Sequence, residues 1–216
     1  MNIIAIGAHP DDIEYGCGGA LLKWAKDPKN EIYVFVATNG EFGKNGVDRK
    51  KEQIKAADIM GVKRIFWGGY RDTAIPMHQK LISDLENIMH IVHADYVFVH
   101  YIDDTHQDHR TLSQCAITAG RYIRNFLFYE GPTTQNFNPN IFVDIEPVLD
   151  EKKKLLEAHH SQITKTNIRN LNIMEMAHSN VNFRGIQGRL KYAESFLSQR
   201  LTLDLNNTKA ENVPKK

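Results

Sequence analysis

Residues 2–12, NIIAIGAHPDD, join a continuously apolar run to a polar turn that carries one histidine and two carboxylates. The uninterrupted apolar run over residues 3–6 is typical of a strand buried on both faces of a parallel sheet. In an open parallel sheet, ligands bind beyond the carboxyl ends of the strands. This stretch therefore indicates both the fold class and the place where the chemistry would lie.

Three more apolar runs follow, at residues 32–37, 64–67 and 96–99, and helical patterns separate them. The helical patterns cover residues 19–26, 49–60 and 77–92. The second has Ile54, Ala57 and Met60 on one side, and the third carries apolar residues at helical spacing, namely Leu81, Leu85, Ile88 and Val92. This alternation predicts an α/β, Rossmann-like fold, a mostly parallel sheet with right-handed crossovers and helices on both faces.

Beyond residue 120 the alternation is looser. Residues 126–129 and 141–144 predict short strands, residues 148–160 a helix with the lysines 152–154 on a solvated face, and residues 167–177 another helix. Residues 205–216 are polar and are expected to fray. Because no repeat or linker divides the chain, we expect one domain over residues 1–204, followed by a polar C-terminal tail.

The composition excludes several classes of protein. Of 216 residues, 42% are hydrophobic and 25% charged, which is ordinary for a globular protein. Twenty-seven basic and 26 acidic residues give a net charge of +1, so nothing resembles the basic footprint of a nucleic-acid binder. The chain shows neither a signal-peptide pattern nor an apolar run of the ~20 residues needed to span a membrane. We therefore expect a soluble protein.

The chain has two cysteines, Cys17 and Cys115. So few thiols in a chain of this length do not make a disulfide framework, although the two could pair. We therefore expect a reducing, cytoplasmic location.

A second dense polar motif, HYIDDTHQDH at residues 100–109, follows the fourth apolar run. It too is expected at the carboxyl end of a strand, so the two motifs can share one rim. A helix start capped by Asp104 or Thr105 would explain the acidic residues of this segment, but not its histidines. Three histidines and three aspartates within ten residues are typical of metal binding or proton transfer.

Combining the two motifs gives a concrete site. An isolated Asp-Asp pair is more often a turn or a helix cap than a catalytic group. Together, however, His9, Asp12 and His109 supply three N/O ligands and leave a position open for water, the pattern of catalytic zinc. The same ligands suit iron or another divalent ion. Asp11 would then point elsewhere, toward whatever approaches the metal.

Nucleotide-binding loops fit this chain poorly. The glycines at 16, 18 and 19 follow the first strand, but the dinucleotide spacing would need glycine at the position of Leu21. No phosphate-binding G-K-[ST] sequence occurs. Tight packing between strand and helix is the better explanation of these glycines.

The segments AHPDDIEYGCGG and THQDH resemble the PIG-L/LmbE family of zinc-dependent N-acetylglucosaminyl deacetylases, notably the bacillithiol- and mycothiol-biosynthesis type. The resemblance extends over roughly residues 1–200 through ATNGEFGKNGVDRKKEQIKAADIMGV, WGGYRD, FVDI and EKKKLLEAHHSQ. The chain departs from the family pattern at Gln107, where proline is usual. It departs again at Asp104, where mycothiol-type enzymes carry a tyrosine thought to help the oxyanion.

The resemblance implies a role for each polar residue. His9, Asp12 and His109 correspond to the zinc ligands, and Asp11 corresponds to the general base. His106 corresponds to the histidine that assists the tetrahedral intermediate, with Asp108 as its carboxylate partner. Arg49 and Asp72 correspond to positions that bind substrate.

The implied activity is metal-dependent hydrolysis of an N-acetyl group on an N-acetylglucosamine-type sugar or conjugate. The expected partner is this small amino-sugar substrate, and the oligomeric state, a homo-oligomer included, stays open. Two alternatives remain: a sugar-binding relative without catalysis, and a different metallohydrolase on the same fold. A relative that had lost catalysis could lack Asp11 and His106, and this chain has both. Two-metal phosphoesterases usually need more bridging carboxylates than this rim offers.

Overall fold

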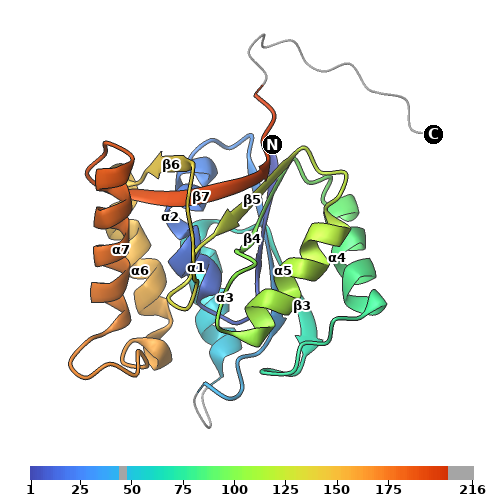
Figure 1. The fold of residues 1–216 in the computed structure, drawn as a ribbon, viewed down its shortest axis with the longest axis horizontal. Helices are drawn as coiled ribbons and strands as arrows, with labels where there is room; N and C mark the ends of the chain where they lie inside the picture. The colour runs from blue at the N-terminus through green and yellow to red at the C-terminus, as the bar shows by residue number, and fades with distance from the viewer. Residues whose placement is uncertain (44–47, 204–216) are drawn as a thin grey trace.

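The structure of the chain is a computed structural model that describes residues 1–43 and 48–203. Within these residues seven strands form one sheet in the order β3-β2-β1-β4-β5-β7-β6 (Figure 1). The strands are β1 (Asn2–Gly7), β2 (Glu31–Thr38), β3 (Arg64–Tyr70), β4 (Tyr96–His100), β5 (Asn125–Tyr129), β6 (Ile141–Asp144) and β7 (Ala193–Arg200). The helices are α1 (Asp12–Gly16), α2 (Gly18–Ala25), α3 (Arg49–Met60), α4 (Gln79–Ile91), α5 (Gln107–Ala119), α6 (Leu149–Ala158) and α7 (Ile173–Gln187).

Strands β1 to β5 are parallel, as the alternating pattern predicts, and β7 runs antiparallel to both β5 and β6. The sequence prediction missed β7, since its sequence AESFLSQR has no continuous apolar run. Its polar residues Glu194 and Ser195 are nevertheless buried, because neighbouring segments supply hydrogen-bond partners for both. The polar C-terminal tail expected over residues 205–216 lies outside the described residues.

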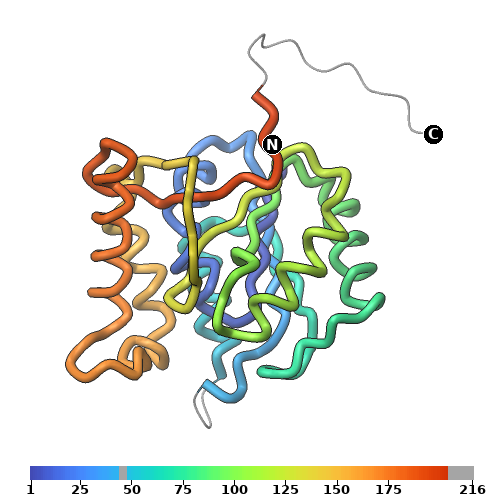
Figure 2. The backbone as a smooth tube through the Cα atoms, viewed as in Figure 1, coloured from blue at the N-terminus to red at the C-terminus, as the bar shows by residue number. Residues whose placement is uncertain are grey.

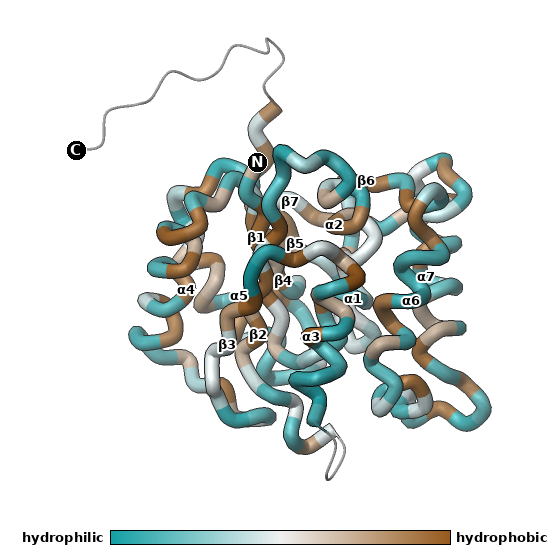
Figure 3. Tube along the Cα trace, turned by 180° about the vertical axis from the view of Figure 1, so that it is seen from behind, coloured by the Kyte–Doolittle hydropathy of each residue, from teal (hydrophilic) through white to brown (hydrophobic). Residues whose placement is uncertain are grey.

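Helices cover both faces of the sheet, which confirms the predicted architecture. Alternate residues of β1 point to opposite faces: Ile3 and Ala5 join one core, and Ile4 and Ile6 join the other. The first core is closed by residues of α1, α2, α3, α6 and α7, and the second by residues of α4 and α5. Figure 3 shows the strands in the middle of the molecule as mostly hydrophobic and the outer faces of the helices as mostly hydrophilic.

Three helix predictions need correction in detail. Helix α3 has the predicted bounds, but Ile54 is 47% exposed while Ala56, Ala57 and Met60 form the buried side. The 167–177 helix in fact begins at Ile173, where Asn172 and Glu175 form a capping box.

Lys152 corrects the third prediction, which placed it on a solvated face. It is only 2% exposed and pairs with Glu194 of β7. The sequence pattern of α6 alone could not show that Lys152 is buried, because the charge that pairs with it, Glu194, lies on another element.

The order of the strands reverses between β1 and β4, which lie side by side at the middle of the sheet. Both polar motifs follow these two strands, so they emerge at the switch point where such sheets bind ligands. In Figure 2 the N-terminus lies at the opposite end of the molecule from the connection between α6 and α7. Among the residues described, no helix is long and apolar enough to cross a membrane.

Candidate active site

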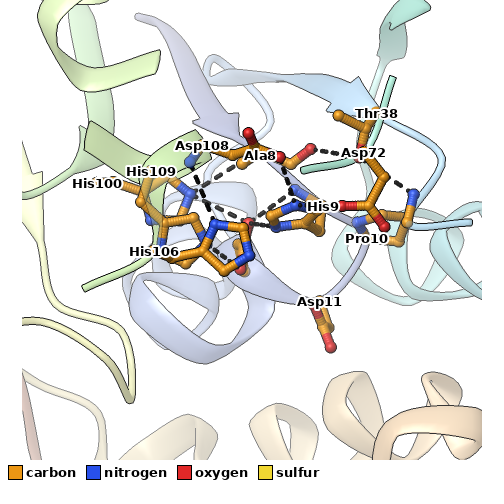
Figure 4. A network of polar contacts seen from close by, with 12 residues as sticks. Ala8, His9, Pro10, Asp11, Thr38, Asp72, His100, His106, Asp108 and His109 are labelled. Carbon is orange, nitrogen blue, oxygen red and sulfur yellow. Dashed lines mark hydrogen bonds and ion pairs between the residues drawn. The ribbon is translucent and has the colours of Figure 1, made fainter. Parts of the chain in front are cut away.

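The turn after β1 separates the side chains of Asp11 and Asp12. The Asp12 carboxylate accepts a 2.7 Å hydrogen bond from the His9 N–H, which folds that side chain back over the turn. Asp11 adopts a φ of 107°, a left-handed conformation that is strained for a residue other than glycine. Its side chain points away from the histidines (Figure 4) and lies 3.1 Å from Arg49 Nη2. The two neighbouring carboxylates thus diverge, as the sequence prediction requires.

The second motif opens helix α5. His106 is the N-cap residue, and its Nδ1 accepts a 3.2 Å hydrogen bond from the Asp108 N–H. Asp108 and His109 lie in the first turn of the helix and are buried. The cap therefore turns both side chains back toward the end of β1.

His9, Asp12 and His109 come together into one cluster, with their ligand atoms all within 4.8 Å of one another. Asp12 Oδ2 lies 3.3 Å from His9 Nδ1, and Asp12 Oδ1 lies 3.4 Å from His109 Nε2. The rings of His9 and His109 are 5.4 Å apart, so the expectation that the two motifs share one site is confirmed. Two imidazoles and one carboxylate at this spacing can hold a divalent ion and leave a position open.

In His9 and His109, the ring nitrogen that does not face Asp12 lies next to a buried carboxylate. His9 Nε2 lies 3.0 Å from Asp72 Oδ1 and 3.2 Å from Asp108 Oδ2. His109 Nδ1 lies 3.2 Å from Asp104 Oδ2. Such carboxylate–histidine pairs orient metal-ligating imidazoles and fix which nitrogen is free to bind. The donor set therefore fits a metal ion held by His9 Nδ1, Asp12 and His109 Nε2.

The negative charges of the cluster favour the binding of a cation. Burial acts to lower the pKa of His9, but Asp108, Asp12 and Asp72 together raise it well above its usual value. Burial opposes protonation of His109 too, yet Asp12 and Asp104 raise its pKa to about 9. Burial alone would raise the pKa of Asp12, but His109 and His100 hold it well below its usual range. In the metal-free protein, protons on the imidazoles supply the positive charge that a bound ion would supply instead.

Asp108 differs from its predicted role as the partner of His106. Its carboxylate contacts His9 Nε2 and accepts hydrogen bonds from the N–H groups of Thr73 (2.7 Å) and Ile75 (3.1 Å). Its link to His106 runs through the backbone N–H instead. The predicted pairing of the two side chains is therefore wrong, because residues two apart at a helix start face different neighbours. Burial, followed by the nearby charges of His109 and His9, lowers the pKa of His106.

The two residues expected to bind substrate are largely engaged within the protein. Buried Arg49 donates to the carbonyls of Gly40 and Pro10 and pairs with Asp11. Asp72 contacts His9 through Oδ1, and its Oδ2 accepts a 2.9 Å hydrogen bond from the Phe42 N–H. Arg49 therefore holds the turn after β1, and Asp72 holds the candidate ligand His9. Both side chains also line the site cavity.

Asp104 and His100 belong to the site but were not assigned a role from the sequence. Asp104 accepts hydrogen bonds from the hydroxyls of Thr133 (2.7 Å) and Thr134 (2.9 Å) in addition to its contact with His109. His100 is buried against Asp12 and His109. Their place inside the second motif was the available signal, but the direction of each side chain depends on β5 and the loop after it.

A cavity of about 530 Å³ opens over the cluster. Its size falls in the range of sites for small organic ligands. The catalytic candidates Asp11 and His106 both line it, together with candidate ligands from both motifs. Residues from three other segments complete the wall, namely Phe42 and Gly43, Pro132 and Thr133, and Gln162, Lys165, Thr166, Asn167, Ile173 and Met176.

Comparison with known proteins agrees with this geometry. Residues 4–120 match the family model PIG-L, described as GlcNAc-PI de-N-acetylase. YaiS of Escherichia coli K12, described as an uncharacterized deacetylase, is 35% identical over 171 residues, which span 74% of this chain and 91% of YaiS.

Solved structures share the fold. The N,N'-diacetylchitobiose deacetylase of Pyrococcus horikoshii superposes with a TM-score of 0.79 at 25% identity, covering 92% of this chain and 83% of that enzyme. The 4-carboxy-2-hydroxymuconate hydratase GalB of Pseudomonas putida KT2440 superposes with a TM-score of 0.78 at 19% identity, covering 94% and 99%. The second likeness concerns the fold alone, so the fold by itself does not choose the reaction.

Proposed function

The chain belongs to the PIG-L family, and on this premise we propose that it is a metal-dependent hydrolase that removes the N-acetyl group from an N-acetylglucosamine-type sugar or conjugate. The observation that carries the proposal is the open cluster of His9, Asp12 and His109, with Asp11 and His106 lining the same cavity. Zinc is the metal we propose, since two imidazoles, one carboxylate and an open position are its usual catalytic set. Iron or another divalent ion fits the same donors.

An amide is a poor electrophile and water a poor nucleophile, so the site must supply both activation and charge stabilisation. A bound zinc ion would lower the pKa of water and polarise the acetyl carbonyl. Asp11 is assigned to take the proton of the attacking water and to deliver a proton to the departing amine nitrogen as the C–N bond breaks. Removal from bulk water and the charge of Asp12 raise the pKa of Asp11, while Arg49 opposes the rise. A carboxylate more basic than usual suits a general base near neutral pH.

His106 is assigned to the oxygen that becomes negative in the tetrahedral intermediate. Its Nδ1 accepts from the Asp108 N–H, so in the neutral ring the proton resides on Nε2. That N–H is a preset donor for an oxyanion in the site cavity, which His106 lines. Neutral His106 can fill this role without the Asp108 carboxylate, which is engaged with His9.

The alternatives fit these residues less well. A sugar-binding relative without catalysis would not need a strained Asp11 held against Arg49 at the cavity. A two-metal phosphoesterase would need carboxylates that bridge two ions, whereas Asp72, Asp104 and Asp108 are each taken up by a histidine and by backbone or hydroxyl donors. We also propose that residues 1–204 act as one domain on a small-molecule substrate.

Release of acetate from a panel of compounds tests the proposal. The panel contains N-acetylglucosamine, di-N-acetylchitobiose, N-acetylglucosamine conjugates with small aglycones, and acetyl-lysine peptides, each with metal-free and zinc-loaded protein. We expect zinc-dependent acetate release from at least one amino sugar and little from the peptides. Preference for the peptides over every sugar, or the absence of acetate release from all sugars, would contradict it.

A further inference from the structure

His100, the last residue of β4, contacts two of the three candidate metal ligands. Its Nε2 lies 3.1 Å from Asp12 Oδ2. Its ring stacks on that of His109 with centroids 3.9 Å apart and an interplanar angle of 11°. The side chain is 1% exposed, so it cannot itself receive substrate. Its contacts therefore act on the ligands and not on the sugar.

The two oxygens of Asp12 have different surroundings. Oδ2 accepts a hydrogen bond from the His9 N–H at 2.7 Å and faces His100 Nε2 at 3.1 Å. Oδ1 faces His109 Nε2, the nitrogen left free for a metal. Oδ2 also lies 3.3 Å from His9 Nδ1, so both oxygens border the ion position. Because two donors face Oδ2, Oδ1 is the oxygen with more free acceptor capacity for the ion.

The tautomer of His100 follows from its neighbours. The Ala8 N–H also lies 3.1 Å from Nε2, and one nitrogen cannot accept from Ala8 and donate to Asp12 at the same time. A hydrogen bond to an ionised carboxylate is about twice as strong as a neutral one, which favours donation to Asp12. Either tautomer leaves one buried N–H without a partner among the described residues, the Ala8 N–H or an Nδ1–H, so the stronger bond to the carboxylate decides for donation to Asp12.

The protein fixes the position of this ring from behind. The Ser113 hydroxyl donates to the His100 carbonyl at 2.8 Å and ties the end of β4 to α5. The ring of Tyr129 lies 4.8 Å away, and its hydroxyl donates to the Ile6 carbonyl of β1 at 2.8 Å. His100 is thus anchored to both strands that carry the polar motifs.

We propose that His100 is a positioning residue that restricts Asp12 to binding the metal through Oδ1. The inference rests on the proposed metal centre, and it assigns a role to a residue that is not one of the three proposed ligands. Partners that orient metal ligands typically contribute 10–100-fold to metal affinity.

Two substitutions separate the hydrogen bond from the stack. His100→Phe keeps an aromatic ring against His109 but removes the donor to Asp12. His100→Gln removes the ring but can place an amide N–H close to the position of Nε2. The measured quantity is the zinc dissociation constant, obtained by competition with a chromogenic chelator, together with the thermal unfolding of each metal-free variant. His90→Phe, at an exposed histidine of α4, is the matched control.

We expect His100→Phe to weaken zinc binding by about 10–100-fold, and His100→Gln to stay within a few-fold of wild type. Equal zinc affinity in wild type and His100→Phe, or equal weakening in Phe and Gln variants, would overturn the proposal. If His100→Phe does not fold, His100→Asn replaces it, because the shorter amide cannot reach the Nε2 position. Asn is then expected to bind zinc weakly, and affinity equal to that of Gln would overturn the proposal. A wild type that binds no zinc would instead contradict the proposed function.

Discussion

Asp11 is the residue on which the proposed reaction depends, and its backbone holds it apart from Asp12. The Asp11 carboxylate lies 3.1 Å from Arg49 Nη2 and lines the cavity. We predict that Asp11→Asn retains fold and metal while kcat for acetate release falls about 10²–10⁴-fold, the usual contribution of a positioned general base. Steady-state kinetics with zinc-loaded protein measure this loss.

The control for this prediction is Asp12→Ala, which should weaken zinc binding itself and regain activity when zinc is added in excess. If Asp11 serves only as a turn residue, asparagine replaces it well, because both residues suit turns. Turnover close to wild type in Asp11→Asn at saturating zinc would therefore remove Asp11 from the mechanism.

Phe42 is an exposed aromatic residue at the cavity, with 57% of its surface open. The Phe42 N–H donates a hydrogen bond to the Asp72 carboxylate, and the Asp72 N–H donates one to the Glu41 carboxylate. These bonds fix the backbone that carries the ring. An aromatic face offers apolar contact area to a substrate at low entropic cost. We predict that Phe42→Ala raises KM about tenfold, a loss of about 1.4 kcal/mol of binding, with kcat little changed.

Tyr122→Ala provides the comparison for Phe42, because this tyrosine is exposed and lies outside the site cavity. It is expected to leave both kinetic constants unchanged. A KM for Phe42→Ala equal to that of wild type on every accepted sugar would show that the ring does not contact substrate.

At the scale of the elements, a buried clamp joins β7, α6 and the first two helices. Glu194 accepts 2.7 Å hydrogen bonds from the N–H groups of Gly19 and Ala20 at the start of α2 and pairs with Lys152. Lys152 also donates to the carbonyls of Glu14 and Tyr15 at the end of α1. Because α1 begins at Asp12, this clamp fixes the element that carries one candidate metal ligand.

We predict that Lys152→Met destabilises the protein by about 3–5 kcal/mol, since removing one partner of a buried pair leaves a buried charge uncompensated. Lys153→Met is the matched control, because its ion pair with Asp150 is exposed and such pairs contribute at most about 1 kcal/mol. Chemical denaturation of the metal-free proteins measures both. Equal stability of the two variants would contradict the clamp.

The elements also show what the sequence can and cannot predict. Runs of apolar residues predict β1 to β6. The inner strands β1, β2, β4 and β5 are buried almost throughout and must be apolar on both faces, whereas the edge strands β3 and β6 are only partly buried. Neither strand β7 nor the burial of Lys152 was predicted, and the reason is the same for both. Each carries a buried charge, and burial of a charge is possible only when a distant segment supplies its partner. The partner of Asp108 was mispredicted for the same reason, since His9 is 99 residues away.

At the scale of the whole molecule, the reversal of strand order between β1 and β4 brings together two motifs nearly 100 residues apart. The clustering of His9, Asp12 and His109 was predictable from the sequence because parallel strands place their carboxyl ends on one rim. The contacts of Asp72 and Asp108 with His9, and of Asp104 with His109, were not predicted, since the directions of these side chains depend on loops whose packing no periodicity describes.

The raised pKa values of His9 and His109 predict how the metal-free protein responds to pH. A histidine whose folded pKa lies above its unfolded value of about 6.5 adds stability below that pH, which is lost as pH rises through the folded pKa. For His109 that pKa is about 9, so the metal-free protein should lose thermal stability between about pH 7 and 10. The zinc-loaded protein should not show this loss, because zinc replaces the protons. Thermal unfolding across this range, with and without zinc, checks the prediction, and a flat profile for the metal-free protein would refute it.

The central claim is that one metal ion, held by His9, Asp12 and His109, makes this chain an amino-sugar deacetylase. The most direct test is to titrate metal-free protein with zinc while measuring acetate release from the best sugar of the panel. We expect no activity without metal, a linear rise, and a break at about one zinc per chain. Full activity in the metal-free protein, or zinc binding at one equivalent without any acetate release, would contradict it.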